Sequence, residues 1–173
     1  MPNIIYAEQE LRYAQEAINT YAQTHKFNDK DWLDFLLHLD LCFIKAERGC
    51  QDVKNLFQPF QGSYINLRKK DPLLSYLKNA RDAISHDATI NICSEIFDEN
   101  LFEYTTIGIG NTEEGWMEHK VVKAYPTVIK LQPFKINGKT WQPPKEHLEV
   151  AMLGIKFYDG FLKEIRRKFI DKK

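Results

Sequence analysis

The sequence predicts a mainly α-helical fold, an up-and-down bundle of four to five helices with a small antiparallel β-hairpin elaboration before the last helix. Apolar residues recur every three or four positions in the first half of the chain and again near its end, as on one face of a helix. Between about residues 95 and 142 this period is lost, and β-branched and aromatic residues become frequent. At 173 residues, we expect a single domain, residues 1–173, that includes the β elaboration.

The first two helices are predicted from their apolar stripes. The first runs from about Asn3 to Gln23, with the stripe Ala7, Leu11, Ala14, Ile18 and Tyr21. The second begins at Asp29 or Asp31 and ends near Gly49, and its main stripe is Trp32, Phe35, Leu36, Leu39, Phe43 and Ala46. A second apolar set widens the arc of this helix: Leu33, Leu37, Leu41 and Ile44. We therefore expect the second helix to be central and packed on several sides.

Two further helices contain residues that disfavour helix. Apolar spacing continues over residues 53–67, but Pro59 and Gly62 interrupt it, so we expect a kink or two short helices. A last helix of about 27 residues follows Pro144, and Gly154 weakens its middle.

The fourth helix and the hairpin have the clearest local signals. Asp71 can accept hydrogen bonds from the free N–H groups of a first helical turn, and Pro72 fits the first helical position. The predicted buried stripe of this helix is Leu73, Leu77, Ala80 and Ile84. Strands are expected over residues 102–109, 116–124 and 127–131. In the hairpin over residues 134–141, Asn137 and Gly138 suit the positive φ values of a type I′ turn.

Composition excludes several classes of protein. Lys and Arg number 24, as do Asp and Glu, which argues against indiscriminate coating of nucleic acid. Three cysteines without a CxxC pair indicate neither a disulfide framework nor a cysteine zinc site. The beginning of the chain lacks a secretion signal, and no apolar run is long enough to span a membrane. We expect a cytoplasmic protein without a membrane partner.

The balanced charge is segregated along the chain. Residues 64–81 carry five basic residues and one acid, a balance of +4, whereas residues 82–118 carry nine acids and no Lys or Arg. Residues 119–145 then carry six lysines and no acid. Such blocks are either solvated faces or a local anion-binding groove.

Metal and nucleotide sites are not indicated. Asp31, Asp34 and His38 would share one face of the second helix, as ligands must, but the same spacing describes the polar face of any amphipathic helix. The chain has no HExxH motif and no glycine-rich phosphate loop ending in GK[ST]. Cys42 and Cys93 lie among apolar residues, where thiols are usually buried and inert. We expect no metal and no cofactor.

One constellation in the fourth helix carries a candidate chemistry. In the run RDAISH, Arg81 is followed directly by Asp82 and, after four intervening residues, by His86. This motif resembles that of the HEPN superfamily, whose active members are metal-independent endoribonucleases built on a helical bundle. The resemblance implies catalytic roles for Arg81, Asp82 and His86, a homodimer, and a toxin or phage-defence role with a possible antitoxin protein partner.

Geometry adds a condition to this assignment. At about 100° per residue, Arg81 and His86 lie about 140° apart on an ideal helix, so they do not converge on one phosphate. Either the helix unwinds after Ser85, or a two-fold dimer lines one groove with the motif helices of both subunits; the resemblance implies the dimer. Basic residues near the motif are then the expected RNA contacts: Lys78, Arg68, Lys69 and Lys70.

The residues suggest how such an enzyme would work. RNA supplies its own nucleophile, the 2′-OH, so His86 would carry protons and Arg81 would hold the phosphate, with Asp82 orienting His86 or the arginine of the other subunit. The products would be a 2′,3′-cyclic phosphate and a 5′-hydroxyl. The alternatives are a non-catalytic module that binds RNA or protein through the lysines of residues 120–145, and a dimerisation protein in which Arg81 and His86 are structural.

Overall fold

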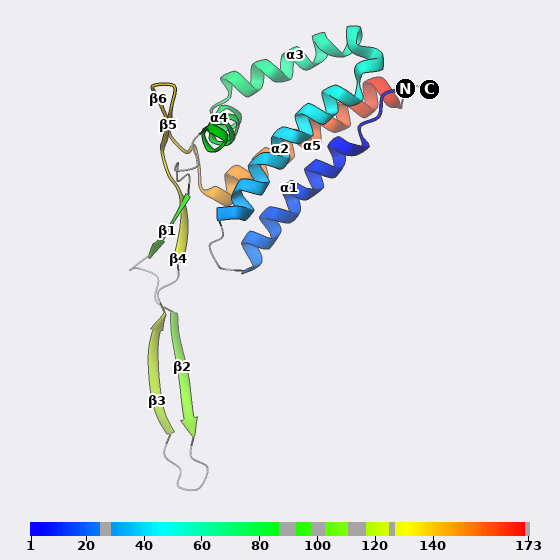
Figure 1. The fold of residues 1–173 in the computed structure, drawn as a ribbon. Helices are drawn as coiled ribbons and strands as arrows, with labels where there is room; N and C mark the ends of the chain where they lie inside the picture. Colours follow the sequence, from blue (N-terminus) through cyan, green and yellow to red (C-terminus); the bar gives the residue numbers. More distant parts are fainter. Residues whose placement is uncertain (25–28, 87–92, 98–102, 111–116, 125–126, 172–173) are drawn as a thin grey trace. The chain divides into compact units, whose positions relative to one another are not determined.

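The structure, a computed structural model, describes residues 1–24, 29–86, 93–97, 103–110, 117–124 and 127–171. These divide into a helical unit, Met1–Cys93 with Leu131–Lys173, and a β unit, Ser94–Lys130. The helical elements are α1 (Ile5–Thr24), α2 (Asp29–Gly49), a 3₁₀ turn η1 (Gln51–Val53), α3 (Lys54–Lys70), α4 (Pro72–His86), α5 (His147–Ile165) and a π turn η2 (Arg166–Ile170) (Figure 1). The mainly helical fold with a small antiparallel sheet before the last helix is confirmed.

The strands form three pairs. In the β unit, β2 (Glu103–Gly110) is antiparallel to β3 (Met117–Ala124). The strands β1 (Cys93–Phe97) and β4 (Thr127–Leu131) also pair. Phe102 and Trp116, which were expected to begin strands, lie outside the described residues.

The predicted hairpin is present and belongs to the helical unit. It consists of β5 (Phe134–Ile136) and β6 (Lys139–Trp141). Asn137 and Gly138 have φ values of 49° and 74°, as a type I′ turn requires. The Phe134 ring packs on the Tyr76 ring of α4, with 5.3 Å between centroids.

The predicted start of α4 is confirmed. Asp71 Oδ1 accepts hydrogen bonds from the backbone N–H groups of Leu73 and Leu74, at 2.9 and 3.0 Å. The buried face is broader than predicted and consists of Leu74, Tyr76, Leu77, Ala80 and Ala83. Leu73 and Ile84 are only half-buried. The face widens because α4 packs on β5 as well as on the other helices.

The alternative of two short helices around Pro59 is wrong, because α3 is continuous. Pro59 removes one backbone hydrogen bond, whose acceptor would be the Asn55 carbonyl. Both residues are exposed, so water can reach that carbonyl. On the opposite face, Phe60 and Tyr64 pack against Phe161 of α5, with ring centroids 6.1 and 4.7 Å apart. We attribute the continuity of α3 to this aromatic contact.

The core lies where α2, α4 and α5 meet. Gly154 of α5 is the residue of closest approach, since a Cβ there would lie 2.9 Å from Leu77 Cδ1 and 3.3 Å from Leu39 Cδ1. The predicted central position of α2 holds for its main stripe, which is buried. Its second apolar stripe is only partly covered, since Leu37 is 45% exposed and Leu33, Leu41 and Ile44 are half-buried. None of the described helices is long and apolar enough to cross a membrane.

Candidate functional site

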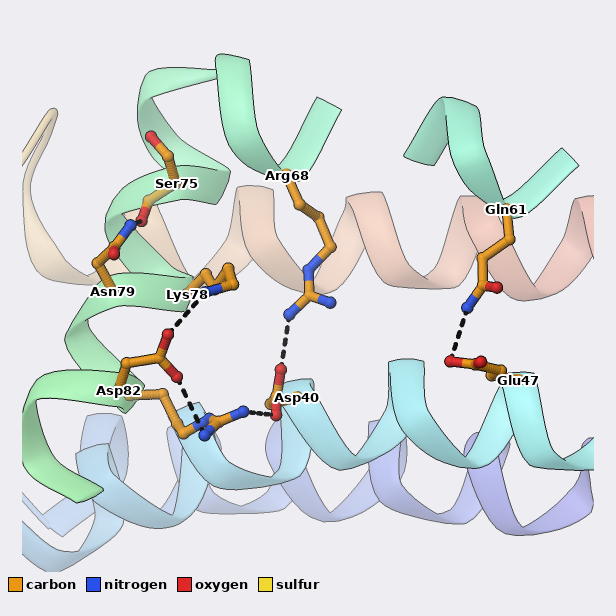
Figure 2. Close-up of polar contacts among 9 residues, drawn as sticks. Asp40, Glu47, Gln61, Arg68, Ser75, Lys78, Asn79 and Asp82 are labelled. Atoms are coloured by element: carbon orange, nitrogen blue, oxygen red, sulfur yellow. Dashed lines mark hydrogen bonds and ion pairs between the residues drawn. The ribbon is translucent and has the colours of Figure 1, made fainter. Parts of the chain in front are cut away.

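Arg81 belongs to a charged cluster that joins three helices. Asp40 of α2, which is 7% exposed, is the centre of this cluster. Arg68 of α3 donates from Nη2 to Asp40 Oδ1 at 2.6 Å, as Figure 2 shows. Arg81 of α4 donates to the other oxygen, Oδ2, of the same carboxylate. One buried acid therefore fixes two arginines from different helices.

Asp82 extends the cluster along α4. Its Oδ2 accepts a hydrogen bond from Lys78 Nζ at 2.6 Å (Figure 2). Its Oδ1 lies 3.0 Å from Arg81 Nη1. The Arg81 guanidinium is thus held between the carboxylates of Asp40 and Asp82. With Arg68 and Lys78, the cluster contains three cations and two carboxylates, a balance of +1.

The cluster runs from the core to the surface. The side chain of Arg68 is 10% exposed, that of Arg81 28%, and that of Lys78 38%. The Arg68 guanidinium also lies 4.3 Å from the centroid of the Phe43 ring, a cation–π contact. Arg68 therefore connects the helices, whereas Arg81 and Lys78 are the members that a ligand can reach.

The predicted RNA contacts in α3 separate into two kinds. Lys69 and Lys70 are exposed, and neither forms an ion pair among the described residues. Arg68 points inward to Asp40, which was not expected. The buried positions of α3 are Phe57, Gln61 and Arg68, which are four and seven residues apart, so Arg68 shares the inner face of the helix.

His86 is the last residue of α4, and its side chain lies outside the described part of the structure. The helix includes His86, so the alternative of unwinding directly after Ser85 does not hold. Both oxygens of Asp82 have partners within α4, namely Lys78 and Arg81. The sequence assigned Asp82 to orient either His86 or the arginine of the other subunit. That assignment stays a prediction.

Asp40 is the functional candidate that the sequence reasoning missed. It interrupts a nearly apolar stretch of α2. A carboxylate at the edge of a core face requires a cationic partner. That requirement was the available signal, although it does not say which cation.

A second polar cluster joins α1 and α2. Glu10 is buried, His38 Nδ1 lies 2.5 Å from its Oε2, and Lys45 donates to its Oε1. Burial raises the pKa of Glu10, but the hydrogen bonds and charges of Lys45 and His38 outweigh it, so that the net pKa is below its usual value. In the part of the chain that the structure describes, no three His, Cys, Asp or Glu residues are placed to hold a metal ion. This applies also to Asp31, Asp34 and His38.

The two cysteines with described side chains are buried. Burial raises the pKa of the Cys42 thiol to about 12 and that of Cys50 to about 11. Thiols with such pKa values are protonated at neutral pH and are poor nucleophiles. The side chain of Cys93 lies outside the described residues.

No protein-family model matches this sequence, and no curated protein or solved structure matches it either. Function is therefore inferred from the residues of the chain itself.

Proposed function

We propose that the helical unit is a HEPN-like, metal-independent endoribonuclease that cleaves single-stranded or loop RNA. The observation that carries this proposal is the setting of Arg81. Its guanidinium is fixed by Asp40 and Asp82, yet its side chain is 28% exposed. A guanidinium held in one orientation at the surface suits the non-bridging oxygens of a phosphate.

The charge of the cluster supports an anionic ligand. Two carboxylates beside Arg81 would by themselves repel a phosphate, but Arg68 and Lys78 bring the balance to +1. A guanidinium also has more N–H donors than its pairs with Asp40 and Asp82 occupy. Arg81 therefore keeps donors for a phosphate while the two acids hold it in place.

The chemistry then requires only proton transfer at the end of α4. His86, whose ordinary pKa is near 6.5, is suited to accept the proton of the RNA 2′-OH at neutral pH. The 2′-oxygen attacks phosphorus, the bond to the 5′-oxygen breaks, and a proton is returned to that oxygen. Arg81 stabilises the charge on the five-coordinate phosphorus. Because Arg81 and His86 of one α4 point about 140° apart, the two residues that act on one phosphate come from the two subunits of a dimer. The products are a 2′,3′-cyclic phosphate and a 5′-hydroxyl.

The test is cleavage of an unstructured RNA oligonucleotide in EDTA. We expect cleavage at the same rate with and without EDTA, 2′,3′-cyclic phosphate and 5′-hydroxyl ends by mass spectrometry, and no cleavage of DNA of the same sequence. The DNA strand is the matched control, because it differs from the RNA only by the absence of the 2′-OH nucleophile and by the methyl group of thymine. Loss of activity in EDTA, or equal cleavage of DNA, would contradict the proposal.

A non-catalytic RNA-binding module is the second candidate, and the lysines after residue 119 favour it. Lys130, Lys135 and Lys139 are exposed. Lys139 Nζ lies 4.0 Å from the centroid of the Trp141 ring, so a cation and an aromatic surface occur together on the β5–β6 hairpin. Proteins that bind single-stranded RNA combine such groups.

Replacing Lys130, Lys135 and Lys139 together with Gln measures how much these lysines contribute to RNA binding. If they contact phosphate, the slope of log K against log salt should flatten by about 0.7 per lost contact with single-stranded RNA. In a nuclease, KM should rise while kcat changes little, because the lysines bind without taking part in the reaction. Fluorescence anisotropy over a salt series gives the slope.

A matched control replaces three exposed lysines on the helices, Lys54, Lys156 and Lys163, and removes the same charge. If both triple variants bind RNA as the unchanged protein does, Lys130, Lys135 and Lys139 serve another purpose, and α4 remains the nucleic-acid candidate.

A further inference from the structure

The outward side of α2 carries a line of residues that we call the α2 seam: Asp34, Leu37, Leu41, Ile44 and Arg48. They are spaced by three and four positions in turn, which is the pattern of a helix that packs along another helix. Leu37 is 45% exposed, and Leu41 and Ile44 are half-buried. The helices of the same chain therefore leave this seam partly open.

The ends of the seam carry opposite charges at equal distances from its middle. Asp34 and Arg48 each lie seven residues from Leu41, which is about two helical turns or about 10 Å on either side. Neither residue has an ion-pair partner among the residues that the structure describes. An acid and a base thus remain unpaired at opposite ends of one apolar line.

This arrangement is complementary to itself. When two copies of α2 lie antiparallel about a two-fold axis at Leu41, Asp34 of each faces Arg48 of the other, and the leucines and isoleucine meet between them. An unrelated partner would not require opposite charges placed symmetrically about one residue. We propose that the α2 seam binds the α2 seam of a second copy of this chain, antiparallel and centred on Leu41.

The seam lies beside the candidate site without sharing residues with it. Asp40, which holds Arg81, directly precedes Leu41. The two Asp40–Arg81 clusters therefore flank the axis of the dimer, and α4 borders the interface while α2 forms it. Dimerisation through the seam does not depend on RNA cleavage, so either proposal can fail alone.

The test is a charge exchange followed by light scattering on the full chain at micromolar concentration. The unchanged protein should have twice the mass of the 20.4 kDa chain. Asp34→Arg places like charges together, and so does Arg48→Asp; each should weaken the dimer by at least about tenfold in Kd. The double variant Asp34→Arg/Arg48→Asp should restore it, because the pair is re-formed with its charges exchanged.

Two more variants locate the contact. Leu37→Glu should dissociate the dimer, whereas Leu56→Glu, at a 68% exposed position of α3, should not. Circular dichroism on each variant shows that the monomer is folded. The proposal is overturned by a 20.4 kDa species for the unchanged protein, by a dimer that Leu37→Glu and Asp34→Arg leave intact, or by a double variant that stays monomeric.

Discussion

Replacement of His86 with Ala should lower RNA cleavage by about 10²-fold or more, because the imidazole is the proposed carrier of the proton between the 2′-OH and the leaving 5′-oxygen. The loss should fall on kcat, since a proton carrier acts in the transition state and binds the substrate little. Single-turnover cleavage of an end-labelled RNA gives the rate of the chemical step directly.

Arg81→Ala should lower cleavage to a similar extent, but for a different reason. Because Arg81 binds the buried carboxylate of Asp40, we expect some loss of stability as well. Arg81→Lys keeps a positive charge near Asp40 and loses the planar fork of donors, so it separates phosphate binding from folding.

Ser85→Ala is the matched control for both substitutions. Ser85 is exposed, lies next to His86 on α4, and its hydroxyl donates a hydrogen bond to the backbone carbonyl of Arg81. Its loss should leave cleavage unchanged. Full activity in His86→Ala would move the proton transfer to another group, and full activity in Arg81→Lys would show that a point charge is sufficient.

The parts of the fold that the sequence predicted are those set by neighbours in the chain. Asp71 and Pro72 start α4 through contacts within one turn, and Asn137 and Gly138 form their turn through their own φ angles. Such signals need no knowledge of the rest of the fold. The start of α4 and the hairpin turn could therefore be predicted from the sequence alone.

The candidate site was predicted only in part, because its contacts join distant positions. Arg81 was identified as part of the motif and Arg68 as a basic residue near it, but Asp40 lies 41 and 28 positions away from them. A run of positive charge does not show which of its members turns inward. The sequence therefore assigned Arg68 to the surface and gave Asp40 no role.

The wide apolar arc of α2 shows a related limit. Its breadth predicted packing on several sides, and the main stripe is indeed buried, but Leu37 is 45% exposed. Apolar periodicity indicates that a face is suited to packing, without indicating whether the partner is in the same chain or in another. The α2 seam is the face where this distinction matters.

Replacement of Asp40 with Ala should have the largest effect on stability of any single change in the cluster, about 3–5 kcal/mol. Among the described residues, Asp40 is the only acid that pairs with Arg68 and one of the two that pair with Arg81, so its loss leaves two arginines close together in a mostly buried site. Asp40→Asn should lose less, because its amide oxygen can still accept one hydrogen bond. Urea unfolding gives the free energy of unfolding. An unchanged m value shows that the variant exposes the same amount of surface when it unfolds.

The double variant Asp40→Leu/Arg68→Met separates the charge pair from the space that it fills. Replacing both partners of a buried pair by apolar residues of similar size is often close to neutral, whereas removing one partner leaves an unpaired charge. We therefore expect the double variant to be more stable than Asp40→Ala. Asp159→Ala, which removes an exposed acid paired with Lys163, is the control and should change stability by less than about 1 kcal/mol. A similarly small loss for Asp40→Ala would show that Asp40 does not hold α2, α3 and α4 together.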